Sequence, residues 1–167
     1  MKKIFEKHET MLVIGLIILY LVMNSFCLKN FGTTDYRSAI INTLFSVAII
    51  CLIVSAKRTS YYGLNGVRDL KKYLYFLPLL LLASVNLWNG IHMDNTIQEI
   101  LFHVITMINV GFLEEILFRG FLFKMMEKDS LKIAMIVSAL TFGIGHIINL
   151  FTGAEFIPTL LQVCYAT

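Results

Sequence analysis

Long apolar runs constrain the fold of this chain more than any other feature of its sequence. A helix needs about 20 mostly apolar residues to cross the hydrocarbon core of a bilayer. The runs of suitable length cover residues 11–28, 39–56, 73–88, 97–123 and 131–150, and a further apolar stretch at 156–167 has only 12 residues. We therefore predict an all-α fold, a polytopic transmembrane helical bundle of about five spans plus the start of a sixth.

The composition of the chain agrees with this fold and excludes several protein classes. Apolar residues make up 57% of the 167 residues and charged residues 15%, whereas soluble domains have roughly 45–50% and about 25%. This hydrophobicity excludes a disordered chain, and three cysteines within apolar runs form no disulfide framework. The net charge of +3 is small and dispersed, so we expect a lipid bilayer as partner and no nucleic acid. We interpret residues 1–167 as a single membrane domain.

Lysine and arginine are distributed unevenly between the predicted loops. The N-terminus, the loop at 57–72 and the loop at 124–132 hold eleven of the 14, while the loops on the alternate side hold two. Because basic loops tend to stay in the cytoplasm, we predict a multi-pass protein with a cytoplasmic N-terminus. The first run could also be a signal peptide, but no small-x-small cleavage site follows it. The short, lysine-rich N-terminus and the lack of a eukaryotic targeting signal favour a bacterial plasma membrane.

The fourth predicted span carries three charged residues in the segment GFLEEILFRGFLF, namely Glu114, Glu115 and Arg119. A charge inside a bilayer is costly, so ionisable residues there indicate a functional site. Glu115 and Arg119 are four residues apart in the favourable order, so they face each other and can neutralise one another. Glu114 lies about 100° further round the helix, without such a partner. Its carboxylate must find a proton, a cation or a bound water.

The fifth predicted span supplies a candidate partner, His146, in the segment TFGIGHIINL. At about 1.5 Å per residue, Glu114 lies about 15 Å and His146 about 21 Å from the cytoplasmic edge. Both depths fall near the middle of a core of roughly 30 Å. The two spans are consecutive and antiparallel, so their side chains can meet. Phe142 and Asn149 flank the histidine as candidate cavity residues, and Gly143 and Gly145 permit a close approach of a backbone or a substrate.

Each of these features also has a purely structural interpretation. The pair of Glu115 and Arg119 could be a structural ion pair, and a lone intramembrane histidine is more often an interhelical hydrogen-bonding group than a catalyst. Asn149 could simply bond across helices. The combination of Glu114 and His146 at similar depth favours a functional site over these alternatives.

A carboxylate and an imidazole that converge in a mostly dry cavity are typical of a water-activating hydrolase. Glu114 would take a proton from a water held between it and His146, and the hydroxide would attack a peptide carbonyl. In the alternative version Zn²⁺ binds the water, with Glu114 and His146 among the three protein ligands that such a site needs. The sequence contains no HExxH motif and no Cys/His cluster, and Arg119 explains Glu115 better than a metal does. We therefore favour activation without a metal or other cofactor.

The two motifs resemble those of the CAAX protease and bacteriocin-processing family of intramembrane endopeptidases, which includes the type II CAAX prenyl endopeptidases and bacterial Abi proteins. The first family motif, EExxxR, falls on Glu114, Glu115 and Arg119, and the second, FxxxH, falls on Phe142 and His146. The resemblance implies an all-helical membrane core with its site in an intramembrane cavity. It implies that the first glutamate and the histidine activate water and that Glu115 with Arg119 orients the site. We expect a membrane-associated or CAAX-like peptide or a membrane protein as substrate, but the motifs alone do not imply which, so prenylated CAAX peptides, secreted peptide precursors and membrane-protein fragments all stay open.

The resemblance covers about residues 97–150 and leaves out a third family motif, a histidine followed four residues later by asparagine or a similar residue. No residues of this sequence match that motif. We expect either a fragment of a longer protein or a degenerate member, and the apolar run at 156–167 favours a fragment. The resemblance implies that the third motif helps to hold the oxyanion, so a polypeptide without it should have little activity. Losing one oxyanion donor lowers kcat by roughly a hundredfold or more.

Two functions from other classes compete with the protease. A transporter or proton relay also uses buried acids and histidines, although the spans are too few for two inverted halves. A non-catalytic membrane scaffold or immunity protein would use Glu114 and His146 only to stabilise helix packing.

Overall fold

The computed structural model describes residues 8–66, 70–78, 81 and 96–167, and within these residues every regular element is a helix. The long elements are α2 (Glu9–Asn30), α3 (Tyr36–Ser55), α5 (Ile97–Glu114), α7 (Leu131–Gly145) and α8 (Phe156–Ala166). The short ones are the 3-10 helices η1 (Leu70–Phe76) and η3 (His146–Thr152), the π-helix η2 (Glu115–Leu122) and α6 (Phe123–Glu127). The predicted all-α fold is confirmed.

Four helical segments of the described chain are long and apolar enough to cross a membrane. They are residues 9–30, 36–55, 97–127 and 131–152, and each matches one of the predicted spans. The predicted span at 73–88 falls mostly outside the described residues. Many large apolar side chains on these helices are exposed, as a surface that faces lipid requires. The chain is therefore a multi-pass membrane protein.

Polar caps set where several helices begin. The Asp35 side chain accepts a hydrogen bond from the backbone N–H of Arg37 at 2.7 Å, and Ser130 caps α7 in the same manner. Thr96 and Glu99 form a reciprocal capping box at the start of α5. Each cap satisfies N–H groups that the first turn of a helix leaves without a partner. The Arg37 side chain also bonds the Asp35 carboxylate and holds the pKa of that carboxyl below its usual range.

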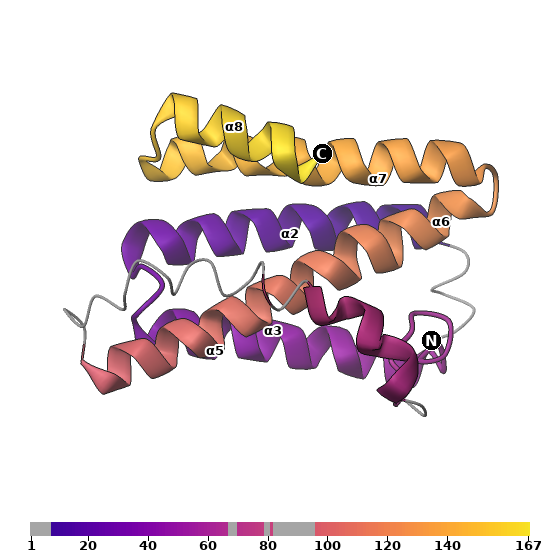
Figure 1. The fold of residues 1–167 in the computed structure, drawn as a ribbon, viewed down its shortest axis with the longest axis horizontal. Helices are drawn as coiled ribbons and strands as arrows, with labels where there is room; N and C mark the ends of the chain where they lie inside the picture. Colours follow the sequence, from indigo (N-terminus) through magenta and orange to yellow (C-terminus); the bar gives the residue numbers. More distant parts are fainter. Residues whose placement is uncertain (1–7, 67–69, 79–80, 82–95) are drawn as a thin grey trace.

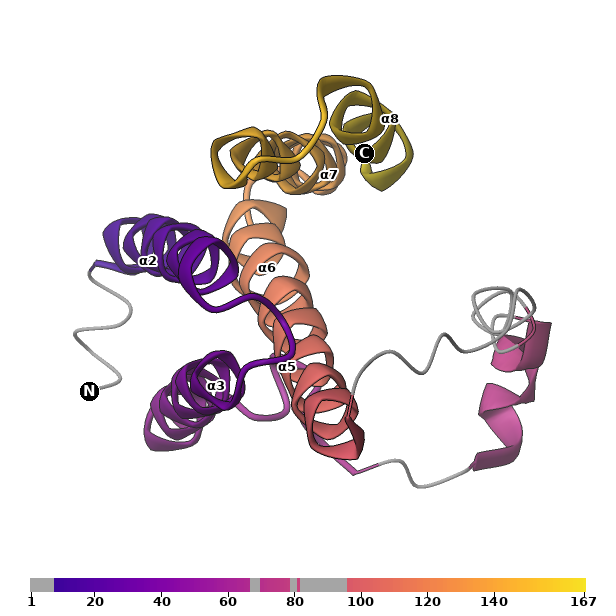
Figure 2. The ribbon, with the colours of Figure 1, turned by 90° about the vertical axis from the view of Figure 1, so that its left-hand side faces the viewer.

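Helix α2 lies between two helix pairs. On one side α3 packs against α5, and on the other side α7 packs against α8 (Figure 1). The continuous rod formed by α5, η2 and α6 crosses from the α3 side of the bundle to the α7 side, while η1 lies apart from the long helices (Figure 2). Because α2 contacts both η2 and η3, the middle of the bundle brings three separate helices together.

The buried core lies where α2, α3 and the middle of this rod meet. Its larger members are Val13, Ile17 and Tyr20 of α2, Ile49 and Ile53 of α3, and Leu113, Leu117, Phe118 and Phe121 of the rod. They recur at helical spacing, so one face of each helix turns inward. Lipid tails are as apolar as these side chains, so close packing, rather than exclusion of water, holds such a core together in a bilayer.

A cluster of charged side chains ties three segments together at one end of the bundle. The carboxylate of Glu9, at the start of α2, lies 3.6 Å from Arg58 after α3 and forms a second ion pair with Lys128 after α6. Nearby, the Tyr61 hydroxyl donates to the backbone oxygen of Lys124 at 3.2 Å. The start of α2, the loop after α3 and the turn after α6 therefore share one end, as the distribution of basic residues predicts.

Tyr62 packs at the end of the core that lies next to this cluster. Its ring meets Phe121 edge-on with 4.7 Å between ring centroids, and only 8% of the residue is exposed. Burial and, to a lesser extent, the nearby Glu9 carboxylate raise the pKa of Tyr62 to about 12. The phenol therefore stays protonated throughout the physiological pH range.

We expect Glu9→Gln to lower the stability of the protein by about 1–3 kcal/mol, because it replaces the carboxylate shared by two cations with a neutral amide. Thermal unfolding in detergent micelles measures the change. Glu155→Gln is the matched control, since Glu155 is exposed and its side chain caps nothing. Equal melting temperatures for the two variants would contradict a stabilising role for the cluster.

Candidate active site

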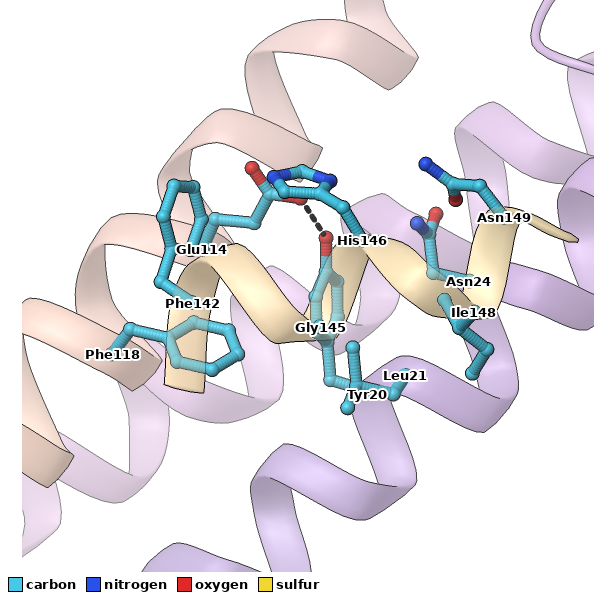
Figure 3. A pocket seen from close by; sticks show the side chains of 10 residues that line it. All are labelled: Tyr20, Leu21, Asn24, Glu114, Phe118, Phe142, Gly145, His146, Ile148 and Asn149. Atoms are coloured by element: carbon cyan, nitrogen blue, oxygen red, sulfur yellow. Dashed lines mark hydrogen bonds between the residues drawn. The ribbon is translucent and has the colours of Figure 1, made fainter. Parts of the chain in front are cut away.

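A small cavity lies where α2, the end of α5 and the junction of α7 with η3 converge (Figure 3). Its volume is about 30 Å³, which is room for a water molecule. The lining side chains and backbone come from Tyr20, Leu21, Asn24, Glu114, Phe118, Phe142, Gly145, His146, Ile148 and Asn149. Polar groups gather on one side of the cavity, and the apolar side chains of Phe118, Leu21 and Ile148 lie on the other (Figure 3). The cavity thus combines polar chemistry with an apolar wall.

Glu114 is the last residue of α5 and is partly buried in the cavity wall. The hydroxyl of Tyr20, a fully buried residue of α2, donates a hydrogen bond to Oε1 of Glu114 at 3.1 Å. The two residues are 94 positions apart in the chain. The sequence analysis identified Glu114 but missed Tyr20. The sequence did contain a signal for this residue, because the phenol of Tyr20 and the amide of Asn24 are four residues apart within an apolar run.

The helix changes its winding directly after Glu114. Residues Glu115–Leu122 form a π-helix inside the otherwise α-helical segment 97–127. Short π segments within α-helices occur frequently at functional sites. Here the segment keeps Leu117 and Phe118 in the core while Glu115 remains exposed. The wider turn therefore separates a buried face from a polar face within one short stretch.

The structure contains the predicted ion pair between Glu115 and Arg119. An Arg119 guanidinium nitrogen donates to Oε2 of Glu115 at 3.1 Å, and the two side chains are 65% and 64% exposed. The guanidinium also lies 5.9 Å from the centroid of the Phe142 ring. Since Phe142 lines the cavity, the ion pair touches the site through this ring.

Phe142 connects the rod to the histidine. Its ring meets Phe118 of η2 edge-on at 5.4 Å and meets His146 edge-on at 5.2 Å between centroids. His146 opens η3, one residue after α7 ends, and is partly buried in the cavity wall. The four-residue spacing of the FxxxH motif therefore places an aromatic ring against the imidazole.

Helix α8 supports this part of the wall from behind. The Asn149 side chain donates to Oε1 of Gln162 on α8 at 3.1 Å. Gly143 lies so close to α8 that a Cβ atom there would sit 3.0 Å from the backbone oxygen of Val163. The close approach expected at Gly143 is confirmed, and the neighbour is the α8 backbone, whereas a Cβ atom at Gly145 would meet only the side chains of Leu21 and Phe118 at 3.8 Å and 3.9 Å.

The donor set of the described residues does not fit the three-ligand zinc site considered above. Within residues 8–66, 70–78, 81 and 96–167, no three His, Cys, Asp or Glu side chains lie close enough together to hold a metal ion. Glu114 and His146 line the cavity with Tyr20, Asn24 and Asn149, which are not usual zinc ligands.

Comparison with known proteins connects the second half of the chain to a family. Residues 96–167 match the family model described as type II CAAX prenyl endopeptidase Rce1-like. The match includes both motifs, so the resemblance read from the sequence is confirmed, whereas α2 and its three cavity residues precede the matched part. The comparisons with curated proteins and with solved structures found no match.

We expect Tyr20 and Glu114 to be energetically coupled by about 1–2 kcal/mol, because their hydrogen bond lies in a partly dry site. A double-mutant cycle of Tyr20→Phe and Glu114→Met, followed by unfolding in detergent, measures the coupling. The matched cycle pairs Tyr20→Phe with Glu115→Met, whose carboxylate bonds Arg119 instead, and should give a value near zero. Equal coupling in both cycles would contradict the contact.

Proposed function

We propose, from the premise that residues 96–167 form an Rce1-like domain, that this protein is an intramembrane endopeptidase whose Glu114 and His146 activate a water molecule. The family assignment supports a CAAX-protease type of membrane endopeptidase. The observation that carries the mechanism is that the two side chains, from different helices, line one cavity with room for a water.

The proposed reaction begins with proton transfer to Glu114. A water in the cavity donates one O–H to the carboxylate and accepts the ring N–H of His146. As the water oxygen attacks the carbonyl carbon of the peptide bond, Glu114 takes its proton as a general base. The Tyr20 hydroxyl bonds one carboxylate oxygen and so leaves the other to face the water.

The tetrahedral intermediate then collapses by breaking its carbon–nitrogen bond. Glu114 returns its proton to the leaving nitrogen, so the products are a carboxylic acid and an amine, and the glutamate is ready for another cycle. The His146 ring N–H stays on the oxygen that came from the water and holds that oxygen in place while the new carbon–oxygen bond forms.

Glu115 and Arg119 act in this mechanism as positioning residues. Their ion pair holds the guanidinium near the Phe142 ring, and that ring contacts His146. The orientation of the imidazole therefore depends on a pair of charges that does not line the cavity. This arrangement explains why both motifs combine a reacting group with a side chain that supports it.

The proposed substrate is a membrane-associated peptide of the CAAX type, because the matched family is described by that activity. An apolar wall on one side of the cavity suits a lipid-anchored or membrane-embedded chain. We propose a bacterial plasma membrane as the location and a cytoplasmic N-terminus, and the basic residues gathered at one end of the bundle support this orientation.

The decisive experiment measures cleavage of a farnesylated, internally quenched CAAX peptide by the full-length protein in proteoliposomes. Glu114→Gln and His146→Ala should each lower kcat by about 100-fold or more, since the first removes the proton acceptor and the second removes a donor that positions the water. Both variants should insert and fold, as judged by a monodisperse peak in size-exclusion chromatography.

Matched controls replace the same residue types away from the cavity. His103, whose Nδ1 lies 3.0 Å from the Thr33 hydroxyl, and the exposed Glu155 should tolerate His103→Ala and Glu155→Gln without loss of turnover. Undiminished cleavage by Glu114→Gln would reject the mechanism. Failure of the wild-type protein to cleave the peptide would reject the proposed substrate and activity.

The positioning role of Arg119 predicts a smaller, separable effect. Arg119→Met should lower kcat by about tenfold with little change in KM, because the variant disturbs the histidine without removing a reacting group. Arg119→Lys keeps the charge and should recover part of the loss. A change confined to KM, or a loss that matches Glu114→Gln, would contradict indirect action through Phe142.

A further inference from the structure

Asn24 of α2 is a cavity residue that lies outside the family-matched part of the chain. We propose that its carboxamide oxygen binds the reactive water and sets the direction from which that water attacks, an inference that rests on the proposed function. Asn24 lies one helical turn beyond Tyr20, so the two side chains share one face of α2. Helix α2 then supplies one group for the glutamate and one for the water.

The first support is the state of the Asn24 oxygen. Its Oδ1 atom is shielded from solvent, and no donor among the described residues bonds it. A buried acceptor without a partner is costly, so native structures seldom keep one unless it has a ligand or a water. This oxygen lies in the wall of a cavity with room for a water. The O–H group of a water in the cavity can donate the hydrogen bond that this oxygen lacks.

The second support is the arrangement of the other polar groups. The polar ends of Tyr20, Asn24, Glu114, His146 and Asn149 lie on the same side of the cavity (Figure 3). Two of these groups are already engaged, since Tyr20 donates to Glu114 and Asn149 donates to Gln162. Glu114, His146 and Asn24 are the groups that the proposal assigns to a shared water.

The hydrogen-bonding capacity of water fits these three groups. Water has two O–H donors and two lone pairs. Glu114 and Asn24 each accept one O–H, and the His146 ring N–H occupies one lone pair. The remaining lone pair points away from all three groups and is the one available to attack a carbonyl carbon. Asn24 thus prevents the second O–H from turning toward the peptide, which is the positioning that raises the rate of a bound reaction.

Asn42 of α3 provides an internal comparison. Its Oδ1 atom is likewise buried without a donor among the described residues, and its amide nitrogen donates to the Ser38 backbone oxygen at 3.0 Å. Asn42 does not line the cavity. Replacing each asparagine by leucine therefore removes the same kind of acceptor, once inside the site and once elsewhere in the membrane core.

The test uses the full-length protein in proteoliposomes with the farnesylated CAAX peptide. Asn24→Leu should lower kcat by about 100-fold and leave KM unchanged, because the water loses an anchor while the peptide keeps its contacts. Asn24→Ala should retain more activity than Asn24→Leu, since the vacated space admits a second water that replaces the missing oxygen. A purely structural role predicts the reverse order, because alanine leaves a packing defect that leucine fills.

Asn42→Leu should cleave the peptide at the wild-type rate. The inference is overturned if Asn24→Leu cleaves as well as wild type, or if Asn24→Ala is the more impaired of the two variants. In that case Glu114→Gln would still abolish turnover and the proposed function would stand. A wild-type protein that leaves the peptide intact overturns the proposed function and this inference together.

Discussion

The hydrogen bond between Tyr20 and Glu114 is the contact on which the site depends. A carboxylate inside a bilayer needs a polar partner, because neither lipid nor apolar side chains can replace its hydration. Tyr20 provides that partner from a helix at the other end of the sequence and is itself enclosed by the core. The same buried residue thus stabilises the packing of α2 on the rod and fixes the acid in place.

Two carboxylates that are adjacent in sequence have different surroundings in this fold. Glu114 faces the cavity and a neutral phenol, whereas Glu115 faces outward and meets a guanidinium. An ion pair of this kind is electrically neutral as a unit, which lowers the cost of keeping its members at a membrane depth. The separation of an acid that lines the cavity from an acid in an ion pair follows from a single residue of offset on one helix.

Much of the fold and part of the site could be predicted from the sequence, because they depend on local properties. Apolar length determined the helices, and the basic loops indicated which ends lie together. The pairing of Glu115 with Arg119 followed from helical spacing. The family match confirms the resemblance of the second half of the chain, while the catalytic roles of Glu114 and His146 stay predictions.

Other features could not be predicted, because they depend on contacts between distant segments. Nothing near Tyr20 in the sequence indicates that its hydroxyl meets an acid 94 residues away. The brace that α8 gives to Asn149 likewise arises from the turn of the chain after η3. The π-helix has no sequence signature of the kind that marks a cap, since it depends on how the rod fits against α2 and α7.

That π-helix also restricts how the chain can vary in length. Each α-helical residue advances the chain by about 100° around the axis, so adding or deleting one residue between Glu115 and Leu122 without a compensating change in winding would turn everything beyond it by about that angle. The loop that leads into α7 would then leave from another side of the rod, and the imidazole would be carried away from the acid. Substitutions in this stretch can be absorbed by repacking, but insertions and deletions change the relative orientation of the two halves of the site.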